Sequence, residues 1–271
     1  MNPLVRSALV IAACTGLLVT GMSAANAAPA LPAQDQAVQE DHAMGSQIRK
    51  YEGGAGVRVR PKADPAILAT VPGIDVSGHQ GNVDWATYWG QGKQFAYVKA
   101  TESTGYTNPY FAQQYNGSYN VGMIRGAYHF ALPDRSTGSA QANYFLANGG
   151  GWSSDGKTLP GALDMEYNPY GSTCYGLSAA SMTTWIRSFS DTYHSRTGVY
   201  PVIYTSTSWW NQCVGSSFSG TNPLWVARYA SAPGALPYNW GVYTFWQYSS
   251  TPIDQNQFNG AYDRLQALAR G

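Results

Sequence analysis

The sequence predicts an α/β domain whose parallel strands close into a barrel, and three features of residues 73–271 indicate this fold. Short apolar segments alternate with amphipathic or polar segments, as in successive βαβ units. The region is long enough for one domain with a large core. Polar residues follow the apolar segments at seven places. Only a barrel brings every strand end to one rim, whereas an open sheet collects ligands at its switch point.

Seven apolar segments are expected to be strands, and five segments between or after them are expected to be helices. The expected strands are 73–76, 95–99, 123–130, 159–166, 202–205, 224–229 and 242–248. The expected helices are 85–90, 109–121, 139–148, 178–197 and 262–269. The helix 178–197 has the clearest ends, because Ser178 is a favourable N-cap and Gly198 is a favourable stop.

Residues 1–27 have the features of a secretory signal peptide. Arg6 precedes an apolar stretch over 8–19, and Ala25-Asn26-Ala27 forms a small-residue cleavage site. The apolar stretch is too short for a membrane span. A lipoprotein cleavage box ending at Cys14 is the alternative, but residues 17–19 are too apolar for the start of a mature lipoprotein. We therefore expect a secreted, extracellular product.

Residues 28–72 differ in kind from the main domain. They are rich in Ala, Gln, Gly and Pro and show little apolar periodicity, and several basic residues lie between 49 and 62. Such a segment is expected to bury too little surface to offset its ordering entropy. We interpret it as a pro-segment or linker that is removed or mobile, with at most a weak helix within 36–51. The expected division is therefore 1–27, 28–72 and 73–271.

The charge of the main domain excludes one class of partner. Acidic and basic residues are equal in number from Gly73 onward, which argues against a nucleic-acid-binding protein. The four histidines are scattered and no metal-ligand spacing occurs, so we expect neither a metal nor a cofactor. Two cysteines remain after export, Cys174 and Cys213, and a pair in a secreted chain predicts one disulfide.

Two acidic residues, Asp164 and Glu166, follow the apolar segment that begins at residue 159. In a strand, side chains two residues apart point to the same side, so these carboxylates are expected to project together. Like charge and partial burial would then raise at least one pKa. A carboxyl group that stays protonated near neutral pH can act as a general acid, as in glycoside hydrolysis. The simpler alternative is a solvated acidic turn.

Five motifs resemble those of the glycoside hydrolase family 25 lysozymes and occur in the same order. The segments 75–81, 95–102 and 126–130 are similar to the first three strands of that family. Asp164-Met165-Glu166 is similar to its D-x-E motif, and Trp246-Gln247-Tyr248-Ser249 followed by Asp254 is similar to its closing strand. The resemblance covers residues 73–271. With the N-terminal segments and the cysteine pair, the chain looks most like the secreted N-acetylmuramidases of actinobacteria.

The resemblance implies an irregular β/α barrel that cleaves the β-1,4 bond between N-acetylmuramic acid and N-acetylglucosamine in peptidoglycan. By motif, Glu166 would be the general acid, and Asp75, Asp164 and Asp254 would be supporting carboxylates. The residues expected to bind substrate are His129, Tyr204, Tyr229, Gln247 and Tyr248. The expected partner is cell-wall peptidoglycan, with no nucleic acid, no membrane after signal removal, and a monomeric state.

Several alternatives stay open at this stage. Asp75 is also a possible turn or helix cap, His129 a possible core histidine, and Lys99 with Glu102 a possible ion pair. Asp164 is expected to orient the 2-acetamido group of the substrate as an internal nucleophile. Direct attack by Asp75 or Asp164, or an inverting water, is not excluded. The alternative functions are a chitinase-like hydrolase and a catalytically silent wall-binding barrel.

Overall fold

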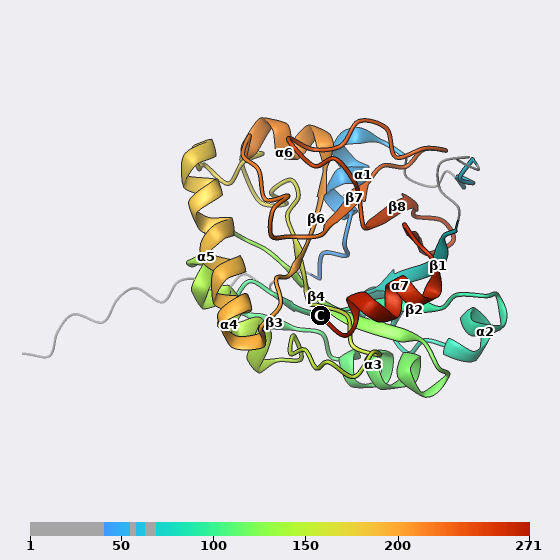
Figure 1. Cartoon of the computed structure of the whole chain (residues 1–271). Coiled ribbons are helices and arrows are strands. Elements are labelled where there is room, and N and C mark those ends of the chain that lie inside the picture. Colours follow the sequence, from blue (N-terminus) through green and yellow to red (C-terminus); the bar gives the residue numbers. More distant parts are fainter. Residues whose placement is uncertain (1–40, 55–57, 63–68) are drawn as a thin grey trace, which may run out of the picture. The chain divides into compact units, whose positions relative to one another are not determined.

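A computed structural model of the chain describes residues 41–54, 58–62 and 69–271, all within one compact unit (Figure 1). The expected signal peptide at 1–27, including the alternative at Cys14, lies outside the described residues. So do residues 28–40 of the expected pro-segment.

The predicted closed barrel is confirmed. Its strands are β1 (Val71–Val76), β2 (Phe95–Glu102), β4 (Ile124–Phe130), β5 (Ala162–Asp164), β6 (Val202–Ser206), β7 (Leu224–Ala227), β8 (Phe245–Ser249) and β9 (Asp254–Phe258). The hydrogen-bonded order is β1-β9-β8-β7-β6-β5-β4-β2, and β2 pairs with β1 to close the ring. A two-residue strand, β3 (Tyr106–Thr107), is added antiparallel to β2 outside the ring.

One strand of the ring runs against the others. β9 pairs antiparallel with both β1 and β8, whereas the remaining ring pairs are parallel. The sequence analysis missed β9 because its Asp-Gln-Asn-Gln-Phe sequence contains no apolar run. The alternation is nevertheless present, since Asp254, Asn256 and Phe258 are buried while the residues between them are partly exposed. Because most of the inward-facing residues are polar, the hydrophobic pattern of the sequence does not reveal this strand.

The helices cover the outside of the barrel. They are α2 (Trp85–Gly90), α3 (Phe111–Asn120), α4 (Gly138–Ala147), α5 (Ala179–Thr197), α6 (Thr207–Cys213) and α7 (Tyr262–Leu268). The five expected helices are confirmed, and the short α6 was not predicted. α5 begins and ends as expected, since Ser178 accepts a hydrogen bond from the Ser181 N–H and Gly198 has φ of 82°. None of the described helices is long and apolar enough to cross a membrane.

A further helix, α1 (Ser46–Glu52), lies in the segment that was expected to be a pro-segment, where a weak helix within 36–51 was considered possible. Figure 1 shows it in blue, in the same part of the molecule as β6, β7 and α6. The Glu52 carboxylate contacts the Ser206 hydroxyl at the end of β6, which fixes this placement. The expectation that this segment buries little surface is wrong for its described part, because Ala43, Met44 and Ile48 are buried.

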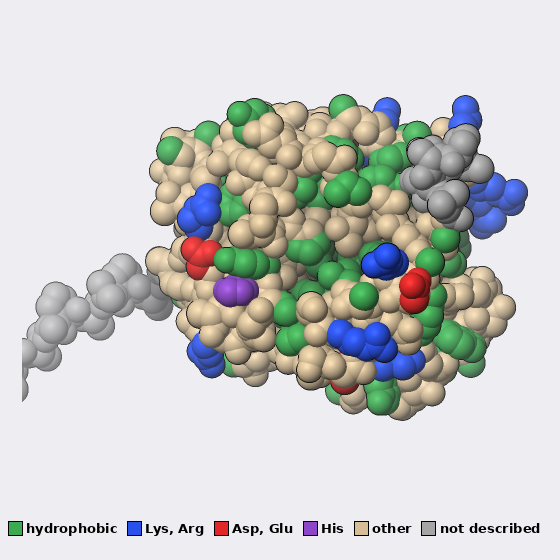
Figure 2. All heavy atoms as spheres, in the orientation of Figure 1, with side chains coloured by type: hydrophobic (Ala, Val, Ile, Leu, Met, Phe, Trp, Pro, Cys, Tyr) green, Lys and Arg blue, Asp and Glu red, His purple; other side chains and the backbone are tan. Residues whose placement is uncertain are grey.

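Aromatic rings from β2, β7, β8 and β9 meet inside the barrel. The cluster consists of Phe95, Tyr97, Trp225, Phe245 and Phe258, with centroid separations of 4.7–5.6 Å. Gly126 on β4 makes room for it, since a Cβ there would lie 2.3 Å from the Tyr97 ring. Rings that bury this much area dominate core energetics, so the barrel interior is packed rather than hollow. The outer face in Figure 2 is mostly uncharged, with charged side chains scattered over it.

The predicted disulfide is confirmed. Cys174, in the loop after β5, is bonded to Cys213 at the end of α6, with a Cα–Cα distance of 5.3 Å. The bond ties together two connections that leave neighbouring strands at the same end of the barrel.

The double variant Cys174→Ala/Cys213→Ala is expected to lose stability. The bond closes a loop with a sequence separation of 39 residues, and a loop of this size contributes about 4 kcal/mol in the chain-entropy model. Urea unfolding of the variant and the oxidised wild type measures the difference. Two alkylatable thiols in the non-reduced wild type would contradict the assignment.

Candidate active site

Four acidic residues gather where the parallel strands end, and we call them the carboxylate site: Asp75, Asp164, Glu166 and Asp254. Asp75 on β1 lies directly opposite Asp254 on β9 in the strand register. Asp164 is the last residue of β5, and Glu166 follows two residues later. All four are buried, with exposed fractions of 6% or less. The sequence analysis identified all four, and the barrel brings them together.

The local geometry at Asp164 and Glu166 differs from the expectation. The expected strand 159–166 is only three residues long in the structure, so Glu166 lies beyond it. The Met165 N–H donates to the Tyr204 carbonyl and the chain then leaves the sheet. The two carboxylates still lie close enough to interact, because the charge of Glu166 adds to burial in raising the pKa of Asp164.

Glu166 is held by backbone N–H groups of the segment before the barrel. Its Oε1 accepts a hydrogen bond from Gly45 (2.7 Å), and its Oε2 accepts from Gln47 (2.8 Å) and Ile48 (2.9 Å). Burial raises the pKa of Glu166 to about 7, although the three N–H groups and the Arg49 charge act in the opposite direction. Desolvation of the carboxylate is therefore the dominant effect.

Asp75 is part of a hydrogen-bond network that crosses the end of the barrel. Its Oδ2 accepts from the side-chain amides of Gln247 (2.9 Å) and Asn256 (2.6 Å). The Gln247 Oε1 accepts in turn from the hydroxyls of Tyr204 and Tyr229, each at 2.7 Å. Burial raises the pKa of Asp75 to about 6, against the lowering effect of these amide donors. Three expected substrate-binding residues thus lie beside a carboxylate.

The remaining two carboxylates, Asp254 and Asp164, differ in their hydrogen-bond partners. Asp254 Oδ1 accepts from Arg49 at 2.9 Å, yet burial and the neighbouring Asp75 hold its pKa well above the usual range. Neither oxygen of Asp164 has a hydrogen-bond partner among the described residues. Burial, with Glu166 next, raises the pKa of Asp164 well above its ordinary value. A buried carboxyl without a partner requires an explanation, and a missing ligand group is one.

The open question about Lys99 and Glu102 is answered by an ion pair. Their charged atoms lie 2.6 Å apart and both side chains are fully buried. Asp41 also accepts from Lys99 at 2.7 Å, and the His42 ring nitrogen lies 2.9 Å from Glu102. The pKa of Glu102 is lowered because the His42 hydrogen bond and the Lys99 charge together outweigh its burial.

His129 does not belong to the site. Its ring nitrogens contact the Thr101 hydroxyl (2.7 Å) and the Gln141 side-chain oxygen (2.9 Å), and its ring stacks on Phe189 of α5. Burial lowers its pKa to about 4, so it is a neutral residue packed between the barrel and its helices. The preceding Tyr128 points inward instead, and its hydroxyl accepts from the Met44 N–H. The expectation chose the wrong one of two neighbours on opposite sides of a strand.

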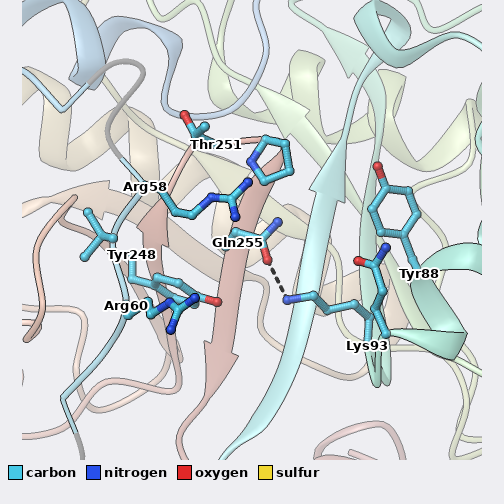
Figure 3. A pocket seen from close by; sticks show the side chains of 10 residues that line it. Arg58, Arg60, Tyr88, Lys93, Tyr248, Thr251 and Gln255 are labelled. Carbon is cyan, nitrogen blue, oxygen red and sulfur yellow. Dashed lines mark hydrogen bonds between the residues drawn. The ribbon is translucent and has the colours of Figure 1, made fainter.

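Tyr248 also lies away from the carboxylates. It lines a separate surface pocket with Arg58, Lys93 and Gln255, shown in Figure 3, and none of the four carboxylates lines that pocket. The preceding residue Gln247 faces the barrel interior, so strand alternation again explains the difference. The role expected for Tyr248 is not supported by its position.

Two residues of the site were missed by the sequence analysis. Asn256 binds Asp75, and its signal was the alternation of β9, two residues after Asp254. Arg49 pairs with Asp254 from a segment that was expected to be removed or mobile, so no local pattern indicated it. Among the described residues, no group of three or more His, Cys, Asp or Glu side chains is arranged to hold a metal ion.

The chain is similar to proteins of one family over nearly the whole barrel. The family model Glycosyl hydrolases family 25 matches residues 74–257. Lysozyme M1 of Streptomyces globisporus is 46% identical over 265 residues, which cover 93% of this chain and 90% of that protein. That match therefore extends into the part of the chain that precedes the barrel.

Two further relatives match a shorter part of the chain. The N,O-diacetylmuramidase of Chalaropsis sp. is 51% identical over 211 residues, covering 74% of this chain and all of that protein. The solved structure of a muramidase from Acremonium alcalophilum is 55% identical with a TM-score of 0.72, covering 74% of this chain and 99% of that one. These matches, with a β/α barrel that carries four buried acids at its rim, show that the chain belongs to glycosyl hydrolase family 25.

Proposed function

We propose that this protein is a lysozyme that hydrolyses the β-1,4 bond between N-acetylmuramic acid and N-acetylglucosamine in peptidoglycan. The observation that carries the proposal is a buried glutamic acid, Glu166, whose pKa of about 7 suits proton donation, surrounded by three further acids. Membership of family 25 supports the reaction class. Relatives named lysozyme and N,O-diacetylmuramidase support the substrate.

Glu166 is the general acid in this proposal. A carboxyl group that stays protonated near neutral pH can pass its proton to the leaving glycosidic oxygen. The other acids of the carboxylate site keep that proton in place, because ionising Glu166 would bring another negative charge into a buried cluster. Any of them that is ionised would also stabilise the positive charge that develops on the sugar ring.

Asp164 orients the 2-acetamido group of the substrate. Both of its oxygens lack a partner among the described residues, so the acetamide N–H would supply the missing hydrogen bond. The acetamide oxygen then forms a bond to the anomeric carbon as the glycosidic bond breaks, and the leaving oxygen takes the proton of Glu166. Asp75 fits direct attack less well, because one of its oxygens is already held by two amide donors.

Gln247, Tyr204 and Tyr229 complete the substrate-binding residues, because Gln247 donates to Asp75 and both tyrosine hydroxyls donate to Gln247. Residues 1–27 act as a signal peptide, 28–72 as a pro-segment and 73–271 as the catalytic domain, although β1 already begins at Val71.

Secretion is supported by the disulfide, a bond typical of exported proteins. We further propose that the secreted protein is a monomer that acts on cell-wall peptidoglycan and has no membrane partner once the signal peptide is removed.

Glu166→Gln is expected to fold normally and to lose nearly all muramidase activity. The amide is isosteric but cannot donate a catalytic proton, and such a loss typically costs about 10²–10⁴-fold. Clearing of a turbid cell-wall suspension by wild type and variant from the same secreting host measures it. Retention of more than about a tenth of the wild-type rate would contradict the role of Glu166 as the acid. A wild type that cleaves chitin but leaves walls intact would exclude a muramidase.

Asp164→Asn is expected to reduce turnover much more than substrate binding and to shift the acid limb of the pH profile. The neutral amide removes the group that orients the acetamide, and it ends the electrostatic interaction between Asp164 and Glu166 as the two carboxyl groups ionise. The single-turnover rate is measured against pH for wild type and variant. An unchanged profile with a lowered melting temperature would mean that Asp164 is only structural.

The free energy of unfolding is expected to fall as pH rises from about 5 to about 7, the window set by the raised pKa values. The pKa of Asp75 rises from 3.8 to about 6 and that of Glu166 from 4.5 to about 7 on folding. The native state therefore binds more protons than the unfolded state in this window. Stability contributed by these protonated groups is present at the acid end and is lost as they ionise.

Urea unfolding at several pH values measures this dependence, and Asp75→Asn provides the control. The variant removes one titrating group and keeps the shape of the side chain, so its pH dependence is expected to be shallower. Glu102 does not reverse the sign, because its lowered pKa places its titration below this window. Wild-type stability that stays constant or rises with pH would contradict the assignment of protonated carboxyls to the native state.

A further inference from the structure

Residues 41–54 occupy the carboxylate site in the full chain. Gly45, Gln47 and Ile48 donate their backbone N–H groups to both oxygens of Glu166. These three residues are buried, as is the adjoining Met44. Both oxygens of the proposed acid are therefore engaged by the chain itself, and donors of this kind favour the ionised form of a carboxyl. While these contacts persist, neither oxygen of Glu166 can approach the glycosidic oxygen of a substrate.

The backbone of this segment leaves no space at the centre of the site. A Cβ built on Gly45 would lie 2.1 Å from the Tyr229 hydroxyl and 2.5 Å from the Tyr204 hydroxyl. Gly45 also has φ of 75°, a conformation that glycine adopts at low cost. The segment thus approaches the two tyrosines as closely as a backbone can. A sugar ring cannot reach these hydroxyls while Gly45 is in place.

The charges of the segment match those of the site. Arg49 pairs with Asp254 at 2.9 Å, and its pKa is raised because the attraction of Asp254 and other neighbours exceeds the effect of burial. At the other end of the segment, Asp41 accepts from the buried Lys99 at 2.7 Å. Partly buried pairs of opposite charge at both ends give the segment a defined orientation.

The segment also covers aromatic surfaces beside the site. Tyr51 stacks on Tyr167, with ring centroids 4.6 Å apart and planes 18° from parallel. The His42 ring packs against Phe130 and Tyr170, at centroid distances of 5.5 and 5.0 Å. The apolar face of a sugar ring can lie on aromatic rings of this kind, and the segment packs against all three of them.

We infer that residues 41–54 are an intramolecular inhibitor, which blocks the carboxylate site until the chain is cut between Gly54 and Val71. The cut would leave the barrel whole, because β1 begins at Val71. Arg58, Arg60 and Lys62 lie between the two points and are exposed, so a protease specific for basic residues can reach them. A tethered segment needs little intrinsic affinity, since its effective concentration is high. This inference rests on the proposed lysozyme function.

The test uses the full secreted chain with a recognition sequence for a site-specific protease inserted between Gly54 and Arg58. The rate of cell-wall clearing is measured on the intact chain and again after cleavage and separation of the fragment. We expect the rate to rise roughly tenfold or more, because separation ends the high effective concentration of the tethered segment.

Substitutions in the segment test the contacts without proteolysis. Gly45→Val adds side-chain atoms where the two tyrosine hydroxyls lie, and Arg49→Ala removes the partner of Asp254. Both are expected to raise the clearing rate of the uncut chain. Lys50→Ala is the matched control, because Lys50 is exposed on the same helix and its ring contact is with Tyr51 of that helix. Its rate is expected to equal that of the unsubstituted chain.

Each outcome decides the inference. An intact chain that clears walls as fast as the cleaved chain overturns the inhibitor and leaves the lysozyme function standing. Equal rates for Arg49→Ala, Gly45→Val and Lys50→Ala also overturn it. If neither the intact nor the cleaved chain clears walls, the proposed function fails and the inhibitor fails with it.

Discussion

The burial of four carboxyl groups at one end of the barrel is the constraint on which the rest of the site depends. Ionised carboxylates are costly in a dry environment, and close neighbours of like charge add to that cost. The carboxyl groups reduce this cost by staying protonated, since the pKa values of all four are raised: Asp75, Asp164, Glu166 and Asp254. The same property that makes these residues unfavourable for stability makes Glu166 suitable as an acid.

Neutral polar side chains organise the cluster from within the barrel. The Gln247 amide gives its N–H to Asp75 and receives two tyrosine hydroxyls on its oxygen, so its orientation is determined by three partners. Asn256 reaches the same aspartate from β9. The reversed direction of β9 places Asp254 opposite Asp75, where a parallel strand would start at the other end of the barrel. The irregular closure of the barrel is thus part of the site.

The segment before the barrel supplies the groups that the cluster lacks. Among the residues that the structure describes, the hydrogen-bond donors to Glu166 all come from the segment, which supplies three N–H groups and the Arg49 charge. In the absence of the segment, the substrate would meet acids that are still buried by one another and by the surrounding aromatic residues. The inhibitory segment and the substrate would then each supply hydrogen-bond donors to the same acids.

The sequence by itself determined the barrel, most of its strands and helices, the four acids and the disulfide. Apolar periodicity, capping residues and short motifs are local features, so each can be recognised in the sequence without knowledge of tertiary contacts. The tertiary structure alone decided that Tyr128 faces the site while His129 faces the helices, and that Gln247 and Tyr248 divide in the same way. A strand places neighbours on opposite sides, and only its packing decides which side is inner. The position of residues 41–54 could not be predicted from local sequence either. Their contacts are with residues up to about two hundred positions away in sequence.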